Sequence, residues 1–399
     1  MQRRHMIAAV LSAASLLLLG CAPLVIREAK SPARTDAPNA IRTLGSDGRF
    51  STLSAQSVAQ RLHALRADEP VNILALSGGG ADGAFGAGAV VGLTRSGSRP
   101  QFSVVTGVSA GALIAPYAFL GPDWDGQLID IYTTGRGEHL LQSRGLGALF
   151  GSSMYRGTPL KELVDRYATN ALIQAVAREA ATGRLLLVAT TDVGTGEPVV
   201  WDLGSIAMNG GPGARALFRD VLVASASVPG MFPPVVIRVQ EQDALYDEVH
   251  VDGTITVPFF VPLALAEAPK NAIGRSRGAT VYVIVDGRLS EEPLAIPLRV
   301  KAIVSRSVSA GLNHMLRTTL ELTATNAELQ GATLQYAAIP NSYPNVAPFD
   351  FHAETVRSLF RYGYECAESG RLWISASAGA GQITQCPVDA ESMRRFVSR

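Results

Sequence analysis

Two glycine-rich turns contain the residues of this chain that are best suited to chemistry. The second turn, Gly107-Val108-Ser109-Ala110-Gly111, has the G-x-S-x-G pattern of a nucleophile elbow, in which glycines permit a sharp strand-to-helix reversal that exposes a serine hydroxyl. The first turn can aim backbone N–H groups at one point, as the oxyanion of a tetrahedral intermediate requires. Its glycines are Gly78, Gly79, Gly80 and Gly83. The two turns together predict acyl transfer through a serine nucleophile.

The first turn also satisfies the G-x-G-x-x-G pattern of dinucleotide-binding sites. Such a site needs an acidic residue roughly twenty positions further on to hold the ribose. The segment between Asp82 and Asp123 contains no Asp or Glu, and no Gly-Lys-Ser/Thr closes the turn as a phosphate-binding P-loop requires. The sequence therefore disfavours both kinds of nucleotide site.

A serine hydroxyl needs a neighbouring base, and Asp252 is the best candidate. An apolar run ends at this carboxylate and Gly253 follows it, so Asp252 lies at the end of a predicted strand, where open α/β sheets place site residues. His250 would share a strand face with Asp252, which leaves a triad-like arrangement as an alternative. A conventional Ser-His-Asp esterase is a second alternative, because His314 and His352 lie late enough in the chain.

These motifs resemble those of the patatin-like phospholipases. That family has a glycine-rich oxyanion turn, a G-x-S-x-G elbow and a late Asp-Gly-Gly/Ala motif in this order, and corresponding segments occur here in the same order. The block Ala224-Ser225-Ala226-Ser227-Val228-Pro229 also looks like the family's Ala-Ser…Pro block ahead of the aspartate. The resemblance covers residues 73–265, about half of the chain.

The resemblance implies a lipid acyl hydrolase, a phospholipase or esterase acting on membrane lipid or a lipid-like ester. By this resemblance Ser109 is the nucleophile and Asp252 the base of a Ser-Asp dyad, and the first turn holds the oxyanion. The glycines that shape the elbow and the base motif are Gly107, Gly111 and Gly253. We expect no cofactor and no metal, since H-E-x-x-H, paired C-x-x-C and EF-hand patterns are absent from the sequence.

Two residues depart from the family pattern. Asp82 stands in the glycine-rich turn where members usually carry Arg or Lys, and an acid there would not attract a phosphate headgroup. Thr254 stands where the third motif prefers Gly or Ala. These departures leave open a non-catalytic envelope lipoprotein that keeps the fold as an interaction surface.

The elements around the motifs predict a three-layer α/β/α sandwich with a mostly parallel central sheet, because short apolar runs alternate with helical stretches. The predicted strands are residues 71–76, 102–106, 185–190, 199–203, 235–239, 249–252 and 280–286. The predicted helices are residues 83–93, 110–120, 159–169, 215–225, 299–329 and 354–368. We expect a catalytic core at residues 69–270, with residues 271–399 completing or flanking the same domain. Residues 135–151, rich in glycine and leucine, form either a mobile apolar flap or an ordinary loop.

The N-terminus has the features of an export signal. A basic start precedes an apolar region at residues 6–19 that is too short for a comfortable membrane span. The sequence Leu-Leu-Gly-Cys ending at Cys21 resembles the bacterial lipobox, which implies a signal peptide at residues 1–20 and a lipid on Cys21 (a palmitate among its acyl groups). Residues 21–68 mix Pro, Ser, Arg and Asp without sustained periodicity, which predicts a tether that includes one short helix near residues 54–65. An ordinary secretory signal is the alternative. Ala22, which is not aspartate, implies an envelope lipoprotein of the outer membrane, facing the periplasm or the surface.

Composition restricts the remaining possibilities. The chain has 399 residues, of which 47% are hydrophobic, and a net charge of +1. No run of basic residues with interleaved aromatics occurs, so we expect no nucleic-acid partner. Cys366 and Cys386 are the cysteines that remain after Cys21, and export favours a disulfide between them over two free thiols.

Overall fold

The computed structural model describes most of the chain between residues 41 and 386. Its described residues are 41–44, 49–64, 70–145, 151–241, 244–262, 279–290, 295–344, 349–376 and 386. The expected signal peptide, Cys21 and the first part of the expected tether lie outside these residues.

A single sheet forms the centre of the fold, and the described residues contribute eleven strands to it. Its order is β11-β10-β9-β3-β4-β5-β6-β1-β2, and β8 pairs with both β5 and β7. The strands are β1 (Ile41–Leu44), β2 (Phe50–Leu53), β3 (Asn72–Leu76), β4 (Val104–Val108), β5 (Leu185–Asp192), β6 (Glu197–Asp202), β7 (Val235–Glu241), β8 (Ala244–Asp252), β9 (Thr280–Val285), β10 (Thr333–Ala338) and β11 (Ile374–Ser375). Strands β10, β9, β3, β4 and β5 run parallel. The predicted α/β fold with a mostly parallel sheet is confirmed.

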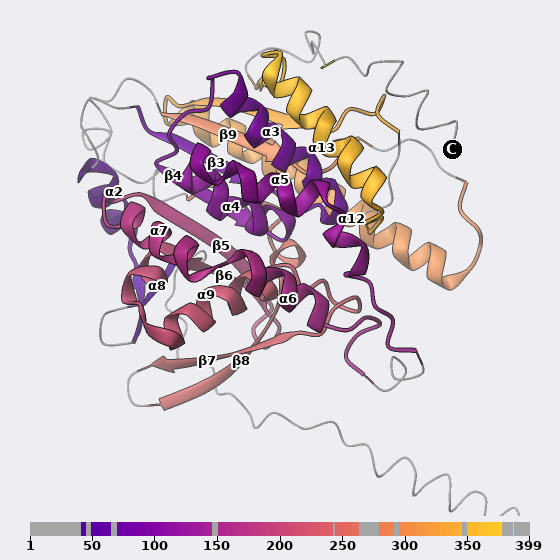
Figure 1. Ribbon diagram of the computed structural model, residues 1–399, viewed down its shortest axis with the longest axis horizontal. Helices are drawn as coiled ribbons and strands as arrows, with labels where there is room; N and C mark the ends of the chain where they lie inside the picture. Colours follow the sequence, from indigo (N-terminus) through magenta and orange to yellow (C-terminus); the bar gives the residue numbers. More distant parts are fainter. Residues whose placement is uncertain are drawn as a thin grey trace, which may run out of the picture.

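Helices cover both faces of this sheet, which explains why β3, β4 and β5 are buried along their whole length. The longer helices are α2 (Ala55–Ala64), α3 (Gly83–Arg95), α4 (Ala110–Leu120), α5 (Asp125–Thr133), α6 (Thr158–Tyr167), α7 (Asn170–Ala180), α8 (Leu203–Asn209), α9 (Gly211–Ser225), α12 (Val300–Leu329) and α13 (Ala353–Glu368). One core cluster joins the sheet to α3–α9 and α13, and the other joins it to α2 and α12. Figure 1 shows α3, α4, α5 and α13 lying across the strands.

Helix α3 packs closely against α13. A Cβ atom built at Gly88 would lie 1.9 Å from the carbonyl oxygen of Phe360, and one at Gly92 would lie 2.3 Å from that of Tyr364. The glycines of α3 therefore allow two helix backbones to approach, rather than serving helix-to-sheet contact alone. The same helix α13 contains Cys366, which the structure joins to Cys386 in a disulfide with a Cα–Cα distance of 5.4 Å.

The folded domain begins earlier in the chain than the sequence predicts. Strands β1 and β2 and helix α2 lie within the residues expected as tether, and β1 pairs with β6 on one side and with β2, the last strand of the sheet, on the other. Arg42 of β1 donates to Glu248 of β8 at 2.6 Å, and Arg61 of α2 donates to Asp202 at 2.9 Å. The short helix predicted near residues 54–65 is present as α2, but the prediction of a tether is wrong for residues 41–44 and 49–64, because they pack onto the folded domain.

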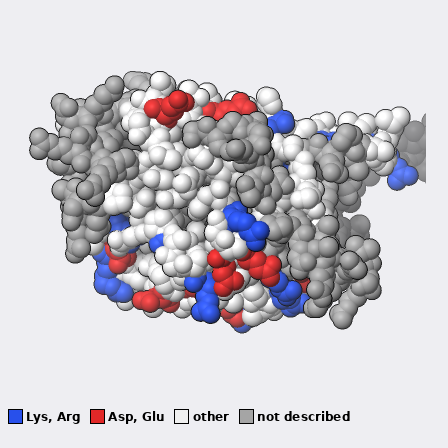
Figure 2. Space-filling view, turned by 90° about the horizontal axis from the view of Figure 1, so that it is seen from above, with Lys and Arg blue, Asp and Glu red and all other residues white. Residues whose placement is uncertain are grey.

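The surface carries charges of both signs. On the face seen in Figure 2, Lys and Arg side chains of the described residues lie interspersed with Asp and Glu along one margin, beside a broad uncharged area. Within the described ranges, none of the helices combines the length and hydrophobicity that a bilayer crossing requires. The same residues contain no cluster of three or more His, Cys, Asp or Glu side chains that could hold a metal ion.

Candidate active site

The sheet brings the two glycine-rich turns and Asp252 together at the carboxyl ends of its central strands. Strands β3 and β4 are parallel neighbours, so the turns that follow them leave the sheet at the same end. In the next two ladders, Val108 of β4 pairs with Ala189 of β5, and Thr190 of β5 pairs with Asp252 of β8. Ser109 and Asp252 thus lie on either side of the end of β5.

Ser109 has the backbone of a nucleophile elbow. Its φ of 53° and ψ of −120° make it the one non-glycine residue with a positive φ among those described. Its N–H donates to Ser225 Oγ at 3.0 Å, and Ser225 Oγ donates to the carbonyl oxygen of Ala189 at 2.7 Å. A Cβ atom at Gly111 would lie 2.4 Å from the Leu76 carbonyl oxygen, so this position needs glycine. Strain of this kind costs on the order of 1–3 kcal/mol and is held by such supporting contacts.

Asp252 is the hydrogen-bond partner of the Ser109 side chain. Ser109 Oγ donates to Asp252 Oδ2 at 2.5 Å, and the carboxyl is only 1% exposed. Its other oxygen, Oδ1, accepts from the backbone N–H of Thr254 at 2.8 Å and from the Thr254 hydroxyl. Burial raises the pKa of Asp252 to about 6, against the opposing effect of the hydrogen bonds from Ser109 and Thr254. A carboxyl with this pKa is a competent base near neutral pH.

Thr254, a departure from the family pattern, therefore orients the carboxyl. We expect Thr254→Val to raise the pKa of Asp252, because the ionised carboxylate loses one donor while the backbone donor and the side-chain volume remain. The acid limb of the pH dependence of kcat/KM should move upward by about one unit, the size of one hydrogen bond to a charged group.

The control for this variant is Thr256→Val, since the Thr256 hydroxyl lies 2.8 Å from Thr191 Oγ1 and has no contact with the carboxylate. An unchanged acid limb in Thr254→Val, or an equal shift in the control, would contradict the role given to Thr254.

The glycine-rich turn offers fewer donors than its four glycines suggest. The N–H of Gly78 donates to the Pro258 carbonyl oxygen at 3.1 Å, and that of Gly83 donates within its own turn. Among the described residues, no acceptor pairs with the N–H of Gly79 or Gly80. The oxyanion role predicted for Gly78 and Gly83 is therefore not supported. A Cβ at Gly78 would lie 2.8 Å from Thr254 Oγ1, and one at Gly83 would lie 2.7 Å from Ala110 Cβ, so these glycines provide space instead.

A buried carboxyl supports this turn from behind. Asp286, which follows β9, accepts from Gly86 N at 2.8 Å through Oδ1, and its own N–H donates to Ser77 Oγ at 2.8 Å. Burial and the nearby Asp82 raise the pKa of Asp286 well above its usual range. One oxygen of each carboxyl, Asp82 Oδ1 and Asp286 Oδ2, is buried without a partner among the described residues.

Asp82 faces this interior rather than the site. It is 7% exposed and is not among the residues that line the cavity beside Ser109. Burial raises the pKa of Asp82 to about 7, although the Arg288 guanidinium opposes this shift. The prediction that Asp82 bears on a phosphate headgroup assumed a side chain that faces the substrate, whereas the structure buries this side chain in the fold.

None of the histidines considered as a base contacts Ser109 in the described structure. His250 is fully buried, with Nδ1 3.0 Å from Thr190 Oγ1 and Nε2 3.0 Å from Glu248 Oε2. Its ring also packs edge-on against Trp201. His314 lies on the exposed surface of α12, and His352 is an exposed residue before α13. The triad alternatives receive no geometric support.

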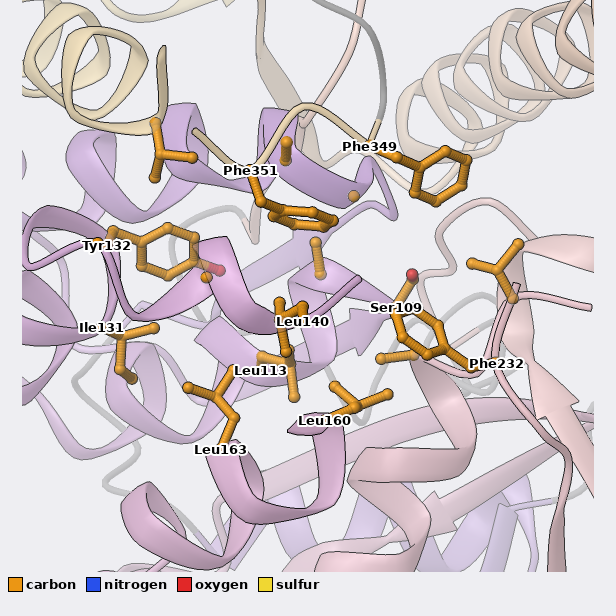
Figure 3. Close-up of a pocket in the computed structure, with 18 of the residues that line it drawn as sticks. Ser109, Leu113, Ile131, Tyr132, Leu140, Leu160, Leu163, Phe232, Phe349 and Phe351 are labelled. Atoms are coloured by element: carbon orange, nitrogen blue, oxygen red, sulfur yellow. The ribbon is translucent and has the colours of Figure 1, made fainter. Parts of the chain in front are cut away.

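An apolar cavity, partly open to solvent, begins at Ser109. Its lining combines α4, α5 and α6 with two segments near Phe232 and Phe351 (Figure 3). Gly80 borders it beside Ser109, so the proposed oxyanion turn and the nucleophile face the same space. Of the predicted flap, Gly135, Gly137 and Leu140 line the cavity, whereas residues 146–150 lie outside the described residues.

Comparison with known proteins relates this site to a family. Residues 74–264 match the family model of the patatin-like phospholipases, which confirms the resemblance seen in the motifs. The crystal structure of VipD from Legionella pneumophila resembles this chain with a TM-score of 0.38 and 12% sequence identity, over 86% of this chain and 72% of that chain. A search of curated proteins gives no significant match.

Proposed function

Since residues 74–264 form a patatin-like phospholipase domain, we propose that this protein is a lipid acyl hydrolase that cleaves carboxylic esters through an acyl-enzyme on Ser109. The observation that carries the proposal is the hydrogen bond of 2.5 Å from Ser109 Oγ to Asp252 Oδ2, beside an apolar cavity that Ser109 lines. A nucleophile, a base and an acyl-binding surface thus occur together, which is what hydrolysis of a fatty acyl ester requires.

The reaction begins when Ser109 Oγ attacks the ester carbonyl carbon and Asp252 takes the hydroxyl proton. The carbonyl oxygen becomes an oxyanion, which the free N–H groups of Gly79 and Gly80 stabilise near the N-terminal end of α3. When the intermediate collapses, the bond to the leaving alcohol breaks, and Asp252 gives the proton to that oxygen. The acyl group is then esterified to Ser109.

The second half of the reaction uses the same groups. Water attacks the acyl carbon while Asp252 takes one of its protons, and the same N–H groups stabilise the new oxyanion. Collapse breaks the bond to Ser109 Oγ, which recovers the proton from Asp252 as the fatty acid leaves. Burial suits Asp252 to this alternation, because a pKa of about 6 lets it both accept and release a proton near neutral pH.

The cavity supports a substrate with a long apolar acyl chain. Aliphatic and aromatic side chains dominate its lining, so an acyl chain gains by leaving water there. The headgroup would remain toward the open end. We further propose that a lipid on Cys21 holds the protein at the outer membrane of a bacterial envelope, within reach of membrane lipids, because Leu-Leu-Gly-Cys resembles a lipobox.

Labelling with a fluorophosphonate probe, followed by mass spectrometry of the labelled peptide, tests the nucleophile directly. We expect the label on Ser109 and none on Ser109→Ala, together with release of free fatty acid from phospholipid or from p-nitrophenyl esters by the wild-type protein. The matched control is Ser227→Ala, which removes a nearby buried hydroxyl that donates to the Val223 carbonyl oxygen rather than contacting the nucleophile. Labelling of another residue, or wild-type protein that hydrolyses none of these esters, would overturn the proposal.

A further inference from the structure

A second apolar cavity lies next to the one at Ser109. The first, here called the proximal cavity, is lined by Ser109 and Gly80. The second, here called the distal cavity, is smaller, is also partly open to solvent, and is lined by neither of them. Three residues line both cavities: Leu113 of α4, Ile131 of α5 and Leu163 of α6. These three side chains therefore stand between the two spaces, and we call them the partition.

The two cavities follow one another along the helices. On α4, Ala110 lines the proximal cavity, Leu113 lines both, and Tyr117 lines the distal cavity. These positions are three and four residues apart, so they lie on one face of the helix, in successive turns of about 5.4 Å. On α6, Leu160, Leu163 and Tyr167 repeat the same order. The distal cavity therefore follows the proximal cavity along α4 and α6, on the side away from Ser109.

The distal cavity suits the end of a hydrocarbon chain. Its lining is aliphatic and aromatic, and the Tyr117 hydroxyl already donates to the Tyr167 carbonyl oxygen at 3.2 Å. The partition residues are partly buried, and each lines both cavities. Figure 3 shows Leu113, Ile131 and Leu163 together at the end of the proximal cavity away from Ser109.

We propose that this partition sets the length of the acyl chain that the enzyme prefers, a proposal that rests on the acyl hydrolase function proposed above. Acyl chains that end at Leu113, Ile131 and Leu163 fit the proximal cavity. The enzyme hydrolyses esters of longer chains with a lower kcat/KM, because the partition keeps the chain end out of the distal cavity. Removing one partition side chain joins the two spaces and allows a longer chain to bury its end.

The test is the dependence of kcat/KM on chain length, measured with p-nitrophenyl esters from butyrate to palmitate in detergent below its micelle concentration. We expect Leu163→Ala to prefer longer chains than the wild type. Its kcat/KM for a longer ester, divided by its kcat/KM for the ester that the wild type prefers, should rise by about tenfold, which is the effect of burying two further CH2 groups. Ile131→Ala, on another helix, should shift the profile in the same direction and covers the case in which Leu163→Ala fails to fold.

Two controls make the test specific. Leu160→Ala is the same change one turn earlier on α6, where the side chain lines only the proximal cavity, so it should not favour the longest chains. Adding Ala168→Leu to Leu163→Ala fills the distal cavity and should restore the wild-type optimum. Unchanged length profiles in active, folded Leu163→Ala and Ile131→Ala would overturn the partition while leaving the hydrolase intact. Failure of the function itself would appear instead as wild-type protein without esterase activity.

Discussion

Asp252→Asn is expected to lower kcat for a carboxylic ester by about 10⁴-fold or more, the loss seen when the base system of a serine hydrolase is disabled. Asparagine has the shape of aspartate, and its carbonyl oxygen can still accept from Thr254. It cannot take the proton of Ser109, which donates to the carboxylate at 2.5 Å. The measurement is turnover of a short-chain p-nitrophenyl ester by protein whose circular dichroism spectrum matches the wild type.

The controls for this prediction are His314→Asn and His352→Asn. Both side chains are exposed and neither contacts Ser109, so each variant should retain wild-type kcat. Loss of turnover in either histidine variant, with activity preserved in Asp252→Asn, would mean that the base is a histidine. The wild-type pH profile gives a second check. Activity should fall as the pH drops through about 6, where Asp252 becomes protonated and can no longer act as a base.

The sequence predicts the residues at the centre of the site because their roles are local. A serine between two glycines specifies an elbow by backbone sterics alone, and Ser109 adopts the expected positive φ. An aspartate at the end of an apolar strand is likewise visible in the sequence, and Asp252 lies within reach of that serine. The strand-end position makes Asp252 the best candidate base for Ser109, and the resemblance adds that the two act as a dyad without histidine.

The supporting residues could not be predicted, because their roles depend on pairing between distant segments. Asp286 lies behind the glycine-rich turn because β9 pairs with β3, a contact between residues about two hundred positions apart. Ser225 could be seen in its small-residue block, but its hydrogen bond to the Ser109 N–H depends on how α9 packs. The sequence shows that Thr254 replaces the Gly or Ala of the family motif, but only the structure shows that its hydroxyl donates to Asp252.

The same limitation explains the errors. Residues 41–44 and 50–53 form strands of only four residues, which are too short to show periodicity, so the sequence predicts a tether there. The sequence gives the position of Asp82 in the glycine-rich turn but not the direction of its side chain. The sequence therefore predicts that this charge faces the substrate. Its burial beside Asp286 and Arg288 changes its expected effect from substrate recognition to stability.

Asp82→Asn is accordingly expected to stabilise the protein at neutral and alkaline pH. The pKa of Asp82 is raised from 3.8 to about 7, so the folded state holds a proton that the unfolded state releases. The stability that this proton provides is complete below the unfolded pKa and is lost as the pH rises through about 7. A pKa shift of this size lowers the free energy of unfolding by at most about 4 kcal/mol once Asp82 is ionised. Asparagine has no proton to lose, so the variant does not lose this stability at high pH.

Urea unfolding of both proteins at about pH 5 and about pH 8 measures this difference through the pH slope of the free energy of unfolding. The excess stability of Asp82→Asn should grow between the two values, while Asp123→Asn, which alters an exposed carboxyl, should leave the slope unchanged. A constant difference between wild type and Asp82→Asn would mean that Asp82 is ionised throughout and held by Arg288. The oxyanion turn would then contain a fixed negative charge beside Asp286. Because the two carboxylates would repel each other, Asp286→Asn should then raise the free energy of unfolding.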